Sequence, residues 1–177
     1  VDNRGPAQFI LGRSADKDTL TRDISGLLLG ASLECAQCHD HPHVGTFLQR
    51  HYHSLSAFMV RSTLFTSPEG GVMLAETADG ESTFEDVFLI KANASPGPQN
   101  ATPAVFDGPG VTEPTFAEGE AYEVAPAEGV RTIPKFSRRA QLAAAVVNDP
   151  RFARNAANRV CAMLLGRGLL HALDLLH

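Results

Sequence analysis

Two cysteines and a histidine stand together at the spacing that covalent haem attachment requires. The segment Cys35–His39 has the sequence CAQCH. In c-type haem attachment, two thiols at this spacing reach the two vinyl groups of the macrocycle, and the histidine that follows presents its imidazole to the iron. The sequence therefore predicts that Cys35 and Cys38 form the haem thioethers and that His39 is the proximal iron ligand.

Two histidines and a methionine further along the chain are candidates for the opposite, distal side of the iron. His51, His53 and Met59 fall in a segment with helical periodicity. His51 and Met59 are eight residues apart and so share one helix face, whereas His53 points elsewhere. A distal histidine favours a low potential, a distal methionine raises the potential, and an open position permits chemistry on a bound ligand. The residues leave these alternatives open.

Three further side chains are candidates for contacts with the haem propionates. His41 and His43 lie too close to His39 in sequence to reach the opposite face of one macrocycle. Arg159 belongs to a basic C-terminal third, and a guanidinium group binds carboxylates in bidentate geometry. Alternatively, both histidines are polar surface residues, and the arginine forms ion pairs with acidic residues in the first half of the chain.

Two other kinds of site would use the same cysteines. A zinc ion needs four ligands, and the histidines near the motif can complete a set that starts with Cys35 and Cys38. The two thiols can instead form a disulfide. Either site would make the chain a structural or interaction module. The third cysteine, Cys161, lies among apolar residues, and we expect a buried, unreactive thiol.

The composition excludes some classes of partner. With 15 basic and 20 acidic residues, the net charge of −5 gives no basic field that would attract nucleic acid or anionic lipid. No apolar run approaches the ~20 residues that span a bilayer, so the chain is not expected to cross a membrane itself.

Apolar periodicity predicts two helices that flank the motif, over residues 16–33 and 44–64. Beyond them, the extended segments 72–77 and 83–90 lie on either side of an Asp-Gly pair, which predicts a small β-hairpin. Residues 92–134 hold most of the chain's 11 prolines and predict a long Pro/Gly-rich connection.

The C-terminal region returns to helical patterns. Ser137 is suited to cap a helix that runs through Val147, and Pro150 suits the first turn of another that extends to Leu165. The predicted fold is therefore mainly α with a small β-hairpin, its helices placed around a c-type haem. Its parts are a helical haem-attachment region (1–66), the hairpin and connection (67–134), and a C-terminal helical region (135–177), together one compact unit.

Two blocks of this sequence resemble a pair of domains known from planctomycetes. The first block resembles the end of a planctomycete cytochrome-c-like domain, and the second resembles the start of the associated domain of unknown function. The first block comprises Leu28–Gly30, Cys35–Pro42, Tyr52, Leu55, Ala57 and Phe58, and the second comprises Arg139-Ala140, Leu142-Ala143, Asn148, Pro150, Phe152–Arg154, Asn158–Val160 and Gly166–Leu169.

The resemblance implies an exported bacterial protein, periplasmic or extracellular, that carries haem c. The chain departs from the family pattern at His43 and His53 near the motif, at Met59, which replaces a second phenylalanine, and at Cys161, which occupies a usual tryptophan position. The added histidines and methionine fit a local adaptation of the iron ligands.

Together these features predict a mono-haem c-type cytochrome that transfers electrons, as a protein of its own or as a subunit of a larger extracytoplasmic assembly. A carrier is favoured over a catalyst because no distal acid/base pair is identifiable. A haem enzyme with an open distal site ranks below both the carrier and the zinc or disulfide module. A single haem needs another cofactor nearby, so we expect a redox partner protein or other haem subunits in a membrane-associated or extracellular assembly.

Overall fold

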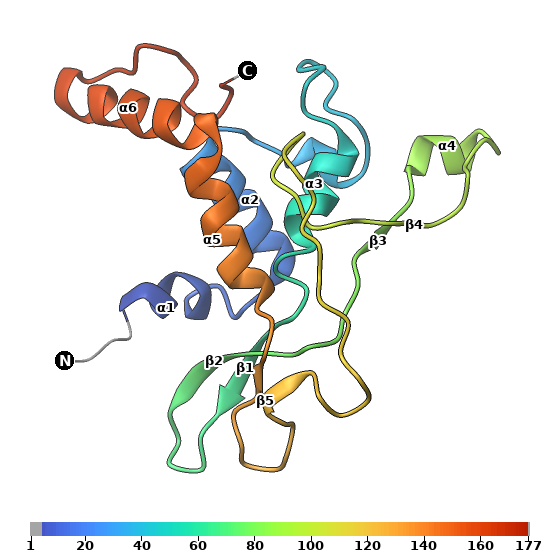
Figure 1. Cartoon of the computed structure of the whole chain (residues 1–177). Helices are drawn as coiled ribbons and strands as arrows, with labels where there is room; N and C mark the ends of the chain where they lie inside the picture. Colours follow the sequence, from blue (N-terminus) through green and yellow to red (C-terminus); the bar gives the residue numbers. More distant parts are fainter. Residues whose placement is uncertain (1–4, 177) are drawn as a thin grey trace.

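The computed structural model describes residues 5–176 of the chain, and 36% of it is helical and 14% strand. Figure 1 shows helices and short β-hairpins joined by long connections. In chain order the elements are α1 (Gly5–Leu11), α2 (Lys17–Leu29), the 3-10 turn η1 (Cys35–Gln37), α3 (Gln49–Ser56), β1 (Ser62–Thr66), β2 (Val72–Glu76), β3 (Thr83–Phe84), α4 (Val87–Lys91), β4 (Gln99–Asn100), β5 (Tyr122–Val124), β6 (Ile133–Pro134), α5 (Arg138–Asn148) and α6 (Pro150–Leu165).

The helix ends follow local chemistry. The Asp16 side chain accepts a hydrogen bond from the Thr19 N–H at 2.8 Å, which begins α2, and Gly30 ends that helix at a φ of 66°. Ser137 caps α5 in the same way, and Pro150 occupies the first turn of α6. The predicted C-terminal helices are confirmed, and the first predicted helix is four residues shorter than expected at its C-terminal end.

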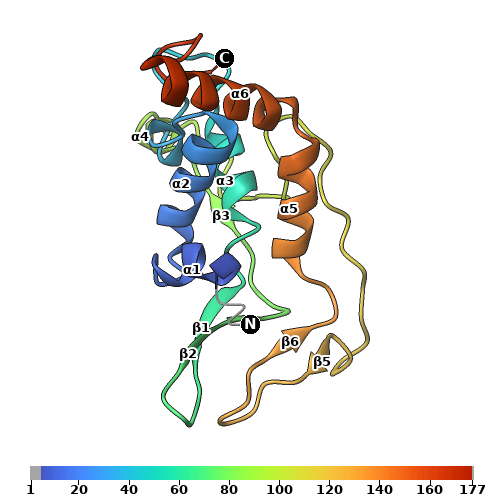
Figure 2. The ribbon, with the colours of Figure 1, turned by 90° about the vertical axis from the view of Figure 1, so that its left-hand side faces the viewer.

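The strands form three separate antiparallel pairs, β1 with β2, β3 with β4 and β5 with β6. The longest, β1 with β2, runs from Ser62 opposite Glu76 to Thr66 opposite Val72. In both ribbon views β1–β2 and β5–β6 lie at one end of the molecule and α6 at the other (Figures 1 and 2).

The prediction of a mainly α chain with a single hairpin is wrong. Within residues 44–64 only Gln49–Ser56 forms a helix, because Ser62–Thr66, rich in β-branched and aromatic residues, pairs as a strand with Val72–Glu76. The segment 72–76 therefore pairs with the residues before it instead of with 83–90, and the hairpin turn lies at residues 67–71 instead of at the Asp-Gly pair. Asp86 accepts hydrogen bonds from the N–H groups of two following residues and begins a helix where a strand was expected.

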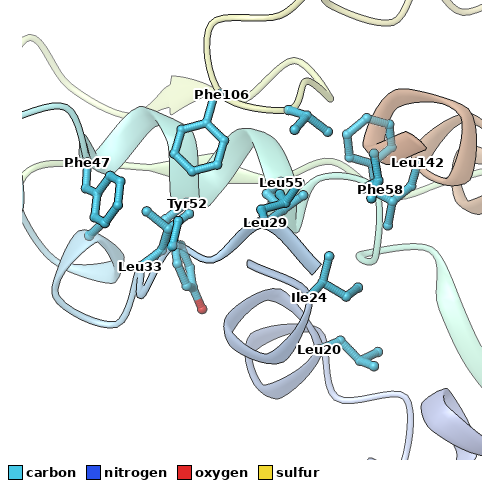
Figure 3. Packing of buried hydrophobic residues seen from close by; sticks show 14 of the residues in the cluster. Leu20, Ile24, Leu29, Leu33, Phe47, Tyr52, Leu55, Phe58, Phe106 and Leu142 are labelled. Carbon is cyan, nitrogen blue, oxygen red and sulfur yellow. The ribbon is translucent and has the colours of Figure 1, made fainter. Parts of the chain in front are cut away.

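The helices pack around an apolar cluster made of their own side chains. Figure 3 shows this cluster, which α2, α3, α5 and the proline-rich connection build together from Leu20, Ile24, Leu29, Leu33, Phe47, Tyr52, Leu55, Phe58, Phe106 and Leu142. The helices thus pack on one another through an apolar core, and the cysteine motif lies at its edge.

A buried ion-pair network joins α5 to the middle of the chain. The guanidinium of Arg138 pairs with Glu81 at 3.1 Å and with Glu113, and it also donates to the Ala57 carbonyl at 3.0 Å. Arg61 binds the same two carboxylates at 3.0 Å each. Two buried cations thereby share two partly exposed anions, which ties the proline-rich connection to the helices.

Among the described residues, no helix combines the length and apolar character that crossing a bilayer requires.

Candidate functional site

The two motif cysteines lie on one side of a tight turn at the edge of the core. A 3-10 helix has three residues per turn, so positions 35 and 38 stand one above the other. Cys35 and Cys38 are exposed free thiols, whereas Ala36 between them is fully buried. The turn is therefore anchored by its alanine and presents both sulfur atoms outward on the same side.

The imidazole of His39 has the tautomer that suits a metal ligand. Its Nδ1 lies 2.6 Å from the backbone oxygen of Asp40, and a carbonyl only accepts, so in the neutral ring Nδ1 carries the proton. The lone pair of the neutral ring is then on Nε2, the nitrogen that is not part of this hydrogen bond. A backbone carbonyl that holds one ring N–H is the usual support of a metal-binding histidine. The residues present thus fit the haem that the sequence implies.

The loop after the motif is closed by hydrogen bonds. The Asp40 carboxylate accepts from the Gln49 N–H at 2.8 Å, at the beginning of α3, and the His41 N–H donates to the Phe47 carbonyl at 2.8 Å. The His41 Nδ1 accepts from the Val44 N–H at 3.0 Å. These bonds join the motif to α3 through a short loop.

The two loop histidines differ in their surroundings. The ring of His41 meets that of Phe47 edge-on at 5.8 Å between centroids and is half-buried, whereas His43 is exposed. Both lie on the loop beside the motif, and their contacts with propionates stay a prediction.

His51 has both ring nitrogens engaged inside the protein. Its Nδ1 accepts from the Leu48 N–H at 3.2 Å, so Nε2 carries the proton and donates to Asp107 at 3.0 Å. The side chain is 2% exposed. Hydrogen bonds from Arg50 and His51 hold the pKa of the Asp107 carboxyl below its usual range. His51 therefore connects α3 to the proline-rich connection, and binding iron through either ring nitrogen would break the hydrogen bond that this nitrogen makes.

His53 reaches the motif, but it binds the backbone there. Its Nε2 lies 3.1 Å from the Gln37 carbonyl, which sits between the two cysteines, and so it donates. Its ring stacks in parallel on Phe84 at 4.6 Å and meets Tyr52 edge-on. Burial lowers the pKa of His53, because the charged form loses water contacts. This histidine supports the turn that carries the thiols.

The third distal candidate, Met59, lies in the core. It packs with Ile24 and Leu142 in an apolar pocket of about 420 Å³ between α2 and α5. Neither of these two partners belongs to the motif or its loop.

Arg159 is also engaged away from the thiols. It donates to the Gly26 carbonyl at 2.7 Å and to the Asn155 side chain at 3.1 Å. Together with Glu34, the residue before the first cysteine, it lines a polar pocket. The thiol of Cys161 is half-buried, so the prediction of full burial is wrong.

Sequence reasoning missed two aromatic residues that contact histidines at or near the motif, Phe84 and Phe88. Both belong to the segment 84–91, which we call the arm. Phe88 on α4 contacts the His39 ring at 5.0 Å between centroids, and Phe84 stacks on His53 as described. The sequence signal was an acidic N-cap, Asp86, followed by the apolar run VFLI, which had been assigned to a strand. Figure 1 shows α4 projecting from the body of the molecule.

No three His, Cys, Asp or Glu side chains within residues 5–176 are grouped closely enough to hold a metal ion. The zinc alternative stays a prediction. Comparisons with family models, with curated proteins and with solved structures find no match for this chain.

Proposed function

We propose that this chain is a mono-haem c-type cytochrome that carries electrons outside the cytoplasm. The observation that supports it best is the arrangement at the motif, where two exposed thiols on one side of a turn precede a histidine whose Nδ1 proton is held by a backbone carbonyl. The thiols supply the covalent anchors and Nε2 of His39 supplies the proximal ligand. Export follows from the resemblance to planctomycete proteins and belongs to the same proposal.

The attachment needs no oxidant and releases nothing. Cys35 and Cys38 each add their S–H across one vinyl double bond, so that sulfur bonds one vinyl carbon and hydrogen goes to the other. The Asp40 carbonyl keeps the Nδ1 proton of His39 in place while Nε2 donates its lone pair. When bound, the haem supplies an iron that gains and loses one electron reversibly.

The position of the motif supports transfer to a partner. Cys35 and Cys38 are on the surface, so a group attached through them stays close to solvent and within reach of another protein. A single haem needs a second cofactor nearby, which makes a redox partner or a further haem subunit part of the proposal.

The direct test is expression in a bacterial periplasm together with a cytochrome c maturation system. We expect the intact mass of the bare polypeptide plus one haem, and a pyridine haemochrome spectrum typical of two thioethers. The double variant C35S/C38S should lose the haem, whereas C161S should keep it. A wild-type protein with the bare polypeptide mass would overturn the proposal, and zinc found by metal analysis would favour the structural module.

A haem protein with an open distal position is the second candidate. It is favoured because His51 has both ring nitrogens bonded, His53 binds the motif backbone, and Met59 lies in the core. The ferrous holoprotein would then bind carbon monoxide without displacing a side chain. A low-spin spectrum that becomes high-spin in one of the variants H51A, H53A or M59L would exclude this candidate.

A further inference from the structure

Three successive large apolar side chains, the first of which contacts the His39 ring, are left partly in solvent. On α4, Phe88 is 56% exposed, Leu89 is 41% and Ile90 is 45%, and none of the five residues of this helix is buried. Leaving about half of each apolar side chain in water forgoes part of the hydrophobic stabilisation that full burial would give. A run of three on one short helix is the kind of surface that a ligand or partner covers.

The arm is held in place by three contacts, one with the motif and two with α3. Phe88 meets the ring of His39, and Phe84 stacks on the ring of His53, which itself binds the motif backbone. The Gln49 side chain, at the beginning of α3, donates to the Glu85 carbonyl at 3.2 Å. These contacts place Phe88, the first residue of the exposed apolar run, against the His39 imidazole.

A haem is a flat, largely apolar ring, and attachment through two surface thiols would leave much of it in water. Because His39 would ligate the iron, whatever touches the His39 ring lies beside the haem on its proximal side. Phe88 makes that contact. Glu34 and Asp40, which flank the motif, are acidic and offer a haem little apolar contact. The exposed Leu89 and Ile90, which follow Phe88, can supply apolar contact area.

We propose that Phe88, Leu89 and Ile90 form the apolar contact surface of the haem. This inference rests on the proposed function, since it names the residues that pack on the group held by Cys35, Cys38 and His39. Phe88 also positions the imidazole through its ring contact. The occupant is thus the protein's own haem rather than a partner protein.

One test uses the absence of tryptophan from this chain. I90W places a single fluorophore on the arm, and L164W places one on the exposed face of α6. Energy transfer to haem falls steeply with distance. We expect the arm tryptophan to lose nearly all emission in the holoprotein, relative to the same variant with C35S/C38S, and the α6 tryptophan to lose less.

The second test is the double variant L89S/I90S, with V147S as the control on another exposed apolar residue, which lies on α5. A more hydrated haem has a lower reduction potential, because water stabilises the charged oxidised form. We expect the potential to fall in the arm variant and to stay unchanged in the control, with haem content measured in parallel.

The outcomes separate the two proposals. Wild-type protein without haem would overturn the proposed function and this inference with it. Haem attached at the wild-type level, with equal quenching at both tryptophans and no shift of potential in L89S/I90S, would overturn the inference alone. Arm variants that keep the potential but lose binding to a redox partner would assign the arm to that partner instead and overturn the haem contact.

Discussion

Phe58 and Phe88 show how differently the two sides of this molecule are built. Phe58 has 0% exposure and packs in the cluster of α2, α3 and α5, whereas more than half of Phe88 is in solvent beside His39. On α4, by contrast, the apolar side chains are about half exposed. Stability and haem chemistry should therefore depend on separate residues.

The strongest test of this separation replaces each phenylalanine with alanine. F58A removes a fully buried ring and should lower the free energy of unfolding by about 3–5 kcal/mol, through lost burial and the cavity left behind. F88A should change it by less than about 0.5 kcal/mol, as surface substitutions do. Urea unfolding measures both. The comparison breaks down if F88A destabilises the haem-free protein as much as F58A.

The buried ion pairs extend the core side of the comparison. R138A leaves the Glu113 carboxylate with fewer partners and removes the hydrogen bond to the Ala57 carbonyl, but Glu81 is more than half exposed and can return to water. We expect a loss of about 2–3 kcal/mol, below the 3–5 kcal/mol of fully buried pairs. R154A, on the exposed side of α6, is the control and should be close to neutral in the same urea titration.

Two glycines of the α2 region should respond with opposite signs. Gly30 has a φ of 66°, and an added Cβ would lie 2.6 Å from a Leu176 carbon, so G30A should cost about 1–2 kcal/mol from backbone strain alone. Gly26 lies inside α2 with open space around its Cα. G26A should therefore gain about 0.5–1 kcal/mol. Thermal unfolding measures both, and a stabilised G30A would show that the turn into the motif is not tightly packed.

Sequence reasoning predicted the parts of the fold that local rules determine. Asp16, Ser137 and Pro150 begin helices at the expected places, because caps and first-turn prolines act through neighbouring backbone groups. It failed where pairing partners are distant. Ser62–Thr66 carries apolar residues that suit either a helix or a strand, and pairing with Val72–Glu76 decides between them. The β3–β4 and β5–β6 pairs lie in a region with weak periodicity and many prolines.

In the candidate site too, sequence reasoning identified the residues whose role depends on local spacing and missed those whose role depends on distant contacts. Cys35, Cys38 and His39 were identified because their chemistry depends on spacing along the chain. The distal candidates were chosen from a helix expected to continue to residue 64, but α3 ends at Ser56, so Met59 leaves that helix face and joins the core. The contacts of Phe84 and Phe88 with histidines about 30 to 50 residues away depend on how the arm folds back, which no local pattern encodes.

The smallest expected effect concerns His53, which lies between the core and the motif. Burial lowers its pKa below the ordinary value of about 6.5, so the unfolded chain binds the proton more readily than the folded chain. The contribution of the neutral His53 ring to the free energy of unfolding is therefore complete above the unfolded-state pKa of about 6.5. It declines as the pH falls from there toward the lower folded-state pKa. In the folded chain the protonated ring would lie beside Phe84 and Tyr52 and would have fewer water contacts than in the unfolded chain.

Urea midpoints of the wild type and of H53Q, measured from neutral pH down to about pH 5, test this linkage. The wild type should lose stability across that range, and H53Q should lose less. The carboxyl groups with lowered pKa, such as Asp16 and Asp107, titrate below this window and contribute little to the change within it. Parallel curves for the two proteins would mean that His53 titrates as in water, and that its stack on Phe84 opens readily to solvent, which would weaken the attachment of the arm to the motif.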